Sequence, residues 1–124
     1  MKKVILASVL AVAAVQAQAA AVTATYCAGA SAAGSGAAAT INSATDQNFV
    51  KSAFTPKCSA NTHVTGEDGG SYFRVGSGST KGKTRYAGTS VGGAVVAAGA
   101  CTAATGCVVS DASTAMQSSY APSS

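Results

Sequence analysis

Large apolar and acidic residues are scarce in this chain of 124 residues. It has no tryptophan, and its only leucines, Leu6 and Leu10, lie near its start. Four acidic residues and one histidine leave few groups for acid–base catalysis or for metal binding. The shortage of bulky apolar side chains predicts a thin hydrophobic core, for which one small domain is the natural size.

The first nineteen residues have the pattern of a secretory signal peptide. Lys2 and Lys3 precede an apolar run over positions 4–15, and Ala17-Gln18-Ala19 supplies the small residues of a cleavage site. We therefore expect residues 1–19 to be removed and the protein to be secreted, to the bacterial cell surface or the periplasm. In that oxidising compartment the four cysteines are expected to form disulfides.

The charge of the chain is partly a property of this leader. The chain carries eight basic and four acidic residues, and without Lys2 and Lys3 its net charge falls from +4 to +2. Such a weak positive charge gives no reason to expect nucleic acid as a partner. After the leader, no run approaches the roughly twenty apolar residues of a membrane-spanning helix, so no transmembrane segment is expected.

Composition divides the chain into four regions. These are the signal peptide (1–19), a flexible arm rich in Ala, Gly and Ser (20–45), a small disulfide-stabilised domain (46–117) and a frayed tail (118–124). The arm has Cys27 as its one strong constraint and too little apolar surface to offset the entropy of ordering it. A sharper alternative is that the arm pairs with a neighbouring subunit.

The fold is predicted to be mainly β, a small antiparallel sheet or sandwich stapled by disulfides, with one or two short helices; an α+β fold is the alternative. Asp68-Gly69 is typical of a two-residue hairpin turn. A hairpin centred on it pairs Val64 with Phe73 and His63 with Arg74. Val64 and Phe73 then share the buried face, and His63 and Arg74 share the other.

Further elements follow from the same patterns. A Gly/Ser loop at 76–79 leads to a third strand at 82–88, which would bury Tyr86, and a fourth strand is expected at 93–98. Residues 41–54 fit either one helix or a short helical or irregular start followed by a strand over 49–54, and we prefer the second. A short helix capped by Ser110 is expected over 111–117.

Four cysteines allow three pairings, which sequence alone does not distinguish. Cys101 and Cys107 enclose only five residues, including a glycine, so we predict the disulfide Cys101–Cys107 and, by elimination, Cys27–Cys58. A zinc site is not expected, because the chain has no close Cys-x-x-Cys pair and only one histidine.

One catalytic motif occurs, but its context does not support an enzyme. Residues 88–92 match the Gly-x-Ser-x-Gly pattern of a nucleophilic serine. A chain so rich in glycine and serine matches it easily by chance, and His63, placed opposite Arg74, would be a poor base because a nearby positive charge disfavours the imidazolium. Glu67 and Asp68 are expected to be solvated at their turn. We therefore predict no catalytic residues, no cofactor-binding residues and no metal ligands.

The candidate binding surface is the outer face of the predicted sheet. Tyr72, Arg74, Lys83 and Arg85 would lie there together and combine an aromatic ring with guanidinium and ammonium donors. This chemistry suits an anionic polymer such as a surface polysaccharide, or an acidic patch on another subunit. A plain alternative is a solvated basic face that protects an edge strand from aggregation.

Two classes of function remain. The leading hypothesis is a secreted structural or interaction protein of the cell envelope, such as a subunit of a surface fibre or coat, with copies of itself or other envelope proteins as partners. It depends on composition, because about three-fifths of the chain after the leader is Ala, Gly, Ser or Thr. The alternative is a small periplasmic or secreted binding module for an anionic ligand such as a polysaccharide.

Overall fold

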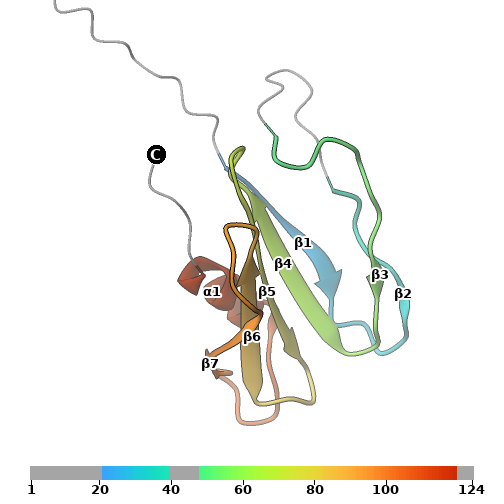
Figure 1. The fold of residues 1–124 in the computed structure, drawn as a ribbon. Helices are drawn as coiled ribbons and strands as arrows, with labels where there is room; N and C mark the ends of the chain where they lie inside the picture. The colour runs from blue at the N-terminus through green and yellow to red at the C-terminus, as the bar shows by residue number, and fades with distance from the viewer. Residues whose placement is uncertain (1–20, 40–47, 120–124) are drawn as a thin grey trace, which may run out of the picture.

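The computed structural model describes residues 21–39 and 48–119, which form an open antiparallel sheet with one helix packed on it (Figure 1). The sheet has the strand order β1-β4-β5-β6-β7, and β2 and β3 form a separate two-stranded ribbon. The prediction of a mainly β, disulfide-stapled antiparallel fold is confirmed. The bounds are β1 Val22–Ala28, β2 Gly34–Ser35, β3 Lys57–Cys58, β4 Thr62–Asp68, β5 Phe73–Ser79, β6 Thr84–Thr89, β7 Val96–Ala100 and α1 Val109–Ser118.

Several predicted segments fall outside the described ranges. They are the signal peptide, positions 40–47 and the last five residues of the chain. The helix found in the described part has ten residues, and no helix there is long and apolar enough to cross a membrane.

The predicted hairpin is present, with a different turn. Glu67 pairs with Arg74 and Asp68 with Phe73, so the connection contains the four residues 69–72 instead of two. The predicted register was therefore wrong by four residues. Because side chains alternate with a period of two, this even shift keeps Val64 and Phe73 on one face and His63 and Arg74 on the other. The predicted burial of the two faces was wrong, because α1 covers the second face. His63, Thr65 and Glu67 are therefore buried, whereas Val64 and Phe73 are only partly buried.

The longer turn is shaped by the carboxylate of Asp68. It accepts hydrogen bonds from the backbone N–H groups of Phe49 (2.8 Å), Val50 (2.9 Å) and Gly70 (2.9 Å). Gly70 has a φ of +82°, a conformation that glycine adopts at little cost. Asp68 is buried, so the prediction that it is solvated was wrong. One buried carboxylate thus fixes both the hairpin turn and the segment that packs beside it.

The predicted Gly/Ser loop is the second half of strand β5. Gly76 faces α1, and a Cβ atom placed on it would collide with the carbonyl oxygen of Ala112 and the backbone nitrogen of Met116. Gly78 lies against the side chain of Cys107, just before the helix. A strand without side chains at these two positions lets the helix backbone approach Gly76 and the disulfide approach Gly78.

Part of the segment predicted to be a flexible arm belongs to the sheet. Residues 22–28 form β1, which pairs with β4. The disulfide Cys27–Cys58 holds it, and the ring of Tyr26 packs against Phe54 and Phe73, with ring centroids 6.0 and 6.3 Å apart. The apolar surface that orders the strand therefore comes from distant aromatic residues, which the local composition of the arm could not indicate.

The remaining elements differ from their predicted positions. The strands after β5 begin later than predicted, β6 at Thr84 and β7 at Val96. Tyr86 is 44% exposed instead of buried, because Ala87 is the β6 residue that pairs with Gly76 under the helix. The described part of the ambiguous segment, residues 48–54, forms neither a helix nor a strand.

Candidate functional site

The four residues of the predicted basic face do not form one exposed surface. Tyr72 lies in the turn before β5, and Lys83 lies in the turn before β6. Arg74 and Arg85 lie on the face of the sheet that α1 covers, because they occupy the same face as Gly76 and Gly78. The structure brings Tyr72 and Arg74 together, with the guanidinium 5.8 Å from the ring centroid.

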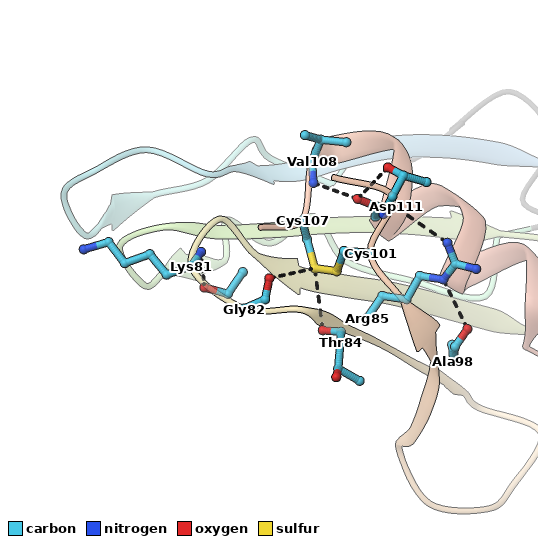
Figure 2. Close-up of a disulfide and its surroundings, with 11 residues drawn as sticks. Lys81, Gly82, Thr84, Arg85, Ala98, Cys101, Cys107, Val108 and Asp111 are labelled. Atoms are coloured by element: carbon cyan, nitrogen blue, oxygen red, sulfur yellow. Dashed lines mark hydrogen bonds and ion pairs between the residues drawn. A yellow bond between two sulfur atoms is a disulfide. The ribbon is translucent and has the colours of Figure 1, made fainter. Parts of the chain in front are cut away.

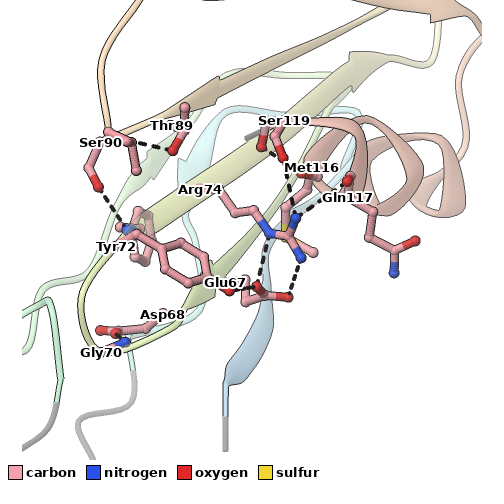
Figure 3. Close-up of polar contacts among 12 residues, drawn as sticks. Glu67, Asp68, Gly70, Tyr72, Arg74, Thr89, Ser90, Met116, Gln117 and Ser119 are labelled. Carbon is pink, nitrogen blue, oxygen red and sulfur yellow. Dashed lines mark hydrogen bonds and ion pairs between the residues drawn. The ribbon is translucent and has the colours of Figure 1, made fainter. Parts of the chain in front are cut away.

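Arg74 is held by the protein itself (Figure 3). Its Nε and Nη2 donate to the two carboxylate oxygens of Glu67 at 2.9 and 3.0 Å, and Nη1 donates to the carbonyl oxygens of Gln117 and Ser119 at 3.3 Å each. The positive charge thus lies at the carboxyl end of α1, where the helix dipole favours it. This arginine joins the sheet to the helix and offers few donors to a ligand.

Glu67 is buried and is the acceptor for two neighbours. Tyr72 donates its hydroxyl to Oε1 of Glu67 at 2.6 Å, beside the ion pair with Arg74. Burial alone would raise the pKa of Glu67, but the hydrogen bonds from Arg74 and Tyr72 and the charge of Arg74 outweigh it and lower the pKa. The hydrogen bond to Glu67 is the main reason why the pKa of Tyr72 is raised. The expectation of a solvated Glu67 was therefore wrong.

Arg85 has a similar structural role at the other end of the helix (Figure 2). Its Nε donates to the carbonyl oxygen of Ala98 at 3.1 Å, and its Nη1 lies 3.6 Å from Oδ1 of Asp111. Asp111 is fully buried and accepts the N–H groups of Val108 at 2.9 Å and Thr102 at 3.0 Å. The bond from Val108 is the main reason why the pKa of Asp111 is lowered, despite its burial.

These bonds also correct the predicted helix cap. The N-cap position is Val108, not Ser110, and it has no polar side chain to offer. Asp111, in the first turn, accepts the N–H of Val108 and so satisfies a donor that the helix cannot satisfy. Arg85 and Asp111 thus tie β6, β7 and the start of α1 together.

A groove of about 290 Å³ lies at one end of strands β4, β5 and β6. Pairing of Thr62 with Ser79, and of Ser77 with Tyr86, places these side chains in two rows on the face opposite α1. We call this surface the hydroxyl groove. Its lining residues are Thr62, Ser77, Gly78, Ser79, Gly82, Lys83, Thr84 and Tyr86.

Several polar groups of the hydroxyl groove are available to a ligand. Within the described ranges, neither the hydroxyls of Ser77, Thr84 and Tyr86 nor the amine of Lys83 has a hydrogen-bond or ion-pair partner. The lining contains no acidic residue, and Lys83 is its one cation. The groove therefore presents neutral donors and acceptors, one aromatic ring and one positive charge.

The Cys101–Cys107 disulfide fixes the turn that carries Lys83 (Figure 2). The N–H of Cys101 donates to the carbonyl oxygen of Lys83, and that of Cys107 to the carbonyl oxygen of Ser79, both at 2.9 Å. The sulfur of Cys107 also lies 3.6 Å from the carbonyl oxygen of Thr84, a contact without a proton because the cysteine is oxidised. The disulfide loop therefore holds both ends of the turn and preorganises one side of the groove.

Both predicted disulfides are confirmed, with Cα atoms 5.7 Å apart in Cys27–Cys58 and 4.9 Å apart in Cys101–Cys107. Donor atoms of Cys101, Cys107 and Asp111 lie close enough to share a metal ion. However, the two sulfurs are bonded to each other, and Asp111 is engaged by backbone donors. The three residues therefore stabilise the loop and the start of α1.

The serine of the Gly-x-Ser-x-Gly match is far from the histidine. Ser90 accepts the N–H of Phe73 at 2.9 Å, next to the Asp68 end of β4. His63 lies near the opposite end of that strand, pairs with Gly78 instead of Arg74, and is buried. Ser90 and His63 are therefore not in contact. The predicted contact of His63 with Arg74 was wrong.

Sequence reasoning missed most of the hydroxyl groove. The signal was present, because Ser77 and Ser79 on one strand and Thr84 and Tyr86 on the next repeat with a period of two. It was hidden because residues 76–79 have the composition of a loop. Of the four residues of the predicted basic face, only Lys83 lines the groove.

Comparisons of the chain with protein families, with curated protein sequences and with solved structures found no match.

Proposed function

We propose that this protein is a secreted structural or interaction subunit of the cell envelope, which assembles with its own copies or with other envelope proteins through the β7 edge. The observation that carries the proposal is the composition of this edge. Residues 91–100 contain no charged residue and no proline, and β7 is the last strand of the sheet. An edge without such residues is a template for pairing with another strand.

Exposed valines adjoin this edge. Val91, Val95 and Val96 are 47%, 69% and 57% exposed. A partner strand along β7 would remove part of this apolar surface from water, which is the main source of affinity in association. A β-bulge interrupts the pairing of β6 with β7 near Ala98, whose carbonyl oxygen is bound by Arg85. Regular pairing with a partner is therefore expected at the Val96 end of the strand.

The opposite edge, β1, is covered at its Tyr26–Cys27 end, which favours β7 as the site of assembly. The carbonyl oxygen of Tyr26 on β1 accepts the N–H of Ala37 at 2.9 Å, and the disulfide Cys27–Cys58 crosses the same edge. Two disulfides suit an oxidising compartment outside the cytosol. The proposal assigns no catalytic role, because Ser90 and His63, the pair that the Gly-x-Ser-x-Gly match would require in contact, lie near opposite ends of β4.

Assembly is tested by placing a charge on the edge. The full chain is expressed with its leader, and surface-sheared, periplasmic and secreted material is examined by size-exclusion chromatography with multi-angle scattering. We expect oxidised high-mass assemblies for the unaltered protein. Val96→Lys should convert them to monomers, whereas Val109→Lys, at an exposed valine of α1, should leave them intact. A periplasmic protein that stays monomeric at high concentration would refute the proposal.

A further inference from the structure

We propose that the hydroxyl groove binds an acidic polysaccharide, with one carboxylate-bearing sugar seated between Lys83 and Tyr86. This site lies on the face of the sheet away from α1, and it is independent of assembly through β7. The inference rests on the lining of the groove, on the unpaired polar groups in it and on the turn that the disulfide holds.

The hydroxyl rows match the chemistry of a sugar chain. A serine or threonine hydroxyl both donates and accepts, as each sugar hydroxyl does, so neither partner has to change its protonation state. Ser77 and Thr84 come from neighbouring strands, which lie about 4.8 Å apart in a sheet. Their hydroxyls have no partner within the described residues, so a ligand would replace only water on them.

The ring of Tyr86 supplies an apolar surface beside these hydroxyls. It is 44% exposed, and the aromatic contacts of the described residues involve other rings. An exposed aromatic ring with a polar tip suits a ligand that is apolar on one side and wet on its edge. A sugar ring has this character, because its C–H groups form a face and its hydroxyls form the rim.

Lys83 determines the charge of the ligand. It is the one cation in the groove and faces no carboxylate there. A neutral sugar would leave this amine without a counter-charge, whereas a uronic acid carboxylate would form a charge-assisted hydrogen bond with it. A nucleic acid would need a row of cations along its phosphates, which this lining does not contain.

The shape favours a polymer over a free small molecule. The volume of about 290 Å³ is at the lower limit of small-molecule pockets, which hold roughly 300–1,000 Å³. The groove lies on the sheet surface instead of inside the core, so a chain can continue beyond the seated unit. The turn is already fixed by Cys101–Cys107, so binding should require little ordering of the protein.

The test is a titration of ¹⁵N-labelled full-length protein with trigalacturonate, followed by amide chemical shifts. We expect saturable shifts at Ser77, Thr84 and Tyr86, and none with the neutral galactose trimer or with inorganic phosphate. Lys83→Gln should weaken binding about tenfold, because it removes a charged hydrogen bond. Tyr86→Ala should weaken it about three- to tenfold by removing the ring.

Lys81→Gln is the matched control. It removes the same charge two residues away, from a side chain that does not line the groove, and it should change the affinity less than about twofold because exposed charges are screened. The proposal is overturned if trigalacturonate gives no saturable shift, if Lys81→Gln weakens binding as much as Lys83→Gln, or if phosphate shifts the same amides. Repeating the titration on Val96→Lys separates binding from assembly, since loss of assembly alone leaves the shifts intact.

Discussion

The two faces of the sheet are stabilised in opposite ways. On the face under α1, the charged residues Glu67 and Arg74 are paired and largely covered, and Gly76 leaves room for the helix backbone. On the open face, the rings of Tyr26 and Phe73 form an aromatic cluster with Phe49 and Phe54, and hydroxyls and valines face solvent. Each face has its own disulfide, Cys101–Cys107 beside the helix and Cys27–Cys58 beside the aromatic cluster.

This difference shows how a chain with few large apolar residues builds a core. Close approach of backbones, allowed by glycine and alanine, replaces bulky side chains on the helix face. The polar groups trapped there are satisfied by one another, as Asp111 is by Val108 and Thr102. Some of the larger apolar side chains, among them Tyr86 and Val95, remain exposed on the open face, where a partner or ligand can contact them.

Removing a disulfide should give the largest loss of stability. The size of the loss should differ between the disulfide of the helix face and that of the open face. Cys27→Ala with Cys58→Ala opens a bridge between residues 31 positions apart, and Cys101→Ala with Cys107→Ala one between residues 6 apart. The chain-entropy relation gives losses of about 4 and about 2 kcal/mol. Urea unfolding followed by circular dichroism measures both. Equal losses, or a larger loss for the short loop, would contradict the expected order.

Filling the space under α1 should give the next largest effect. Gly76→Ala places a Cβ atom against the helix backbone, which cannot move away as a side chain can, so we expect a loss of about 2–3 kcal/mol. The same substitution at Gly34 meets no atom within 4 Å and should change stability by less than about 0.5 kcal/mol. Chemical denaturation of the two variants tests the contrast, and similar losses at both positions would argue against close helix packing.

Acid should act on the helix face more than on the open face. The pKa of Glu67 is lowered from its ordinary value of 4.5. A lowered pKa contributes stability above the unfolded value, and this stability is lost as the pH falls through the folded pKa. We expect the melting temperature to decrease as the pH is lowered beyond about 4.5. Glu67→Gln should make this decrease less steep. A melting temperature with the same pH dependence in both proteins would exclude this role of Glu67.

Changing an exposed valine on the open face should affect stability least. Val95 is 69% exposed, so Val95→Ser should change the free energy of unfolding by less than about 0.5 kcal/mol. It should nevertheless weaken assembly, because it removes apolar surface next to β7. Thermal unfolding and light scattering on the same samples test both effects. A large loss of stability would mean that this valine belongs to the core.

The sequence predicted those features that depend on local pattern. Alternation placed Val64 and Phe73 on one face, although the turn was misplaced, because an even register shift preserves faces. The short spacing of Cys101 and Cys107 predicted their pairing, which left Cys27 and Cys58 for the second disulfide. Local pattern gave a wrong prediction where contacts with a distant segment set the conformation. Asp68 is an example, because its carboxylate accepts the N–H groups of Phe49 and Val50.

By itself, the amino-acid sequence determined that this protein is mainly β, cross-linked and poor in large apolar residues, because alternation, cysteine spacing and composition are local properties. Tertiary structure alone decided which face of the sheet α1 covers. Arg74 and Arg85 can lie under the helix because Glu67 and Asp111 provide their counter-charges there. The hydroxyl groove lies on the uncovered face because α1 covers the other side of the same strands, and the Cys101–Cys107 loop holds their connecting turn.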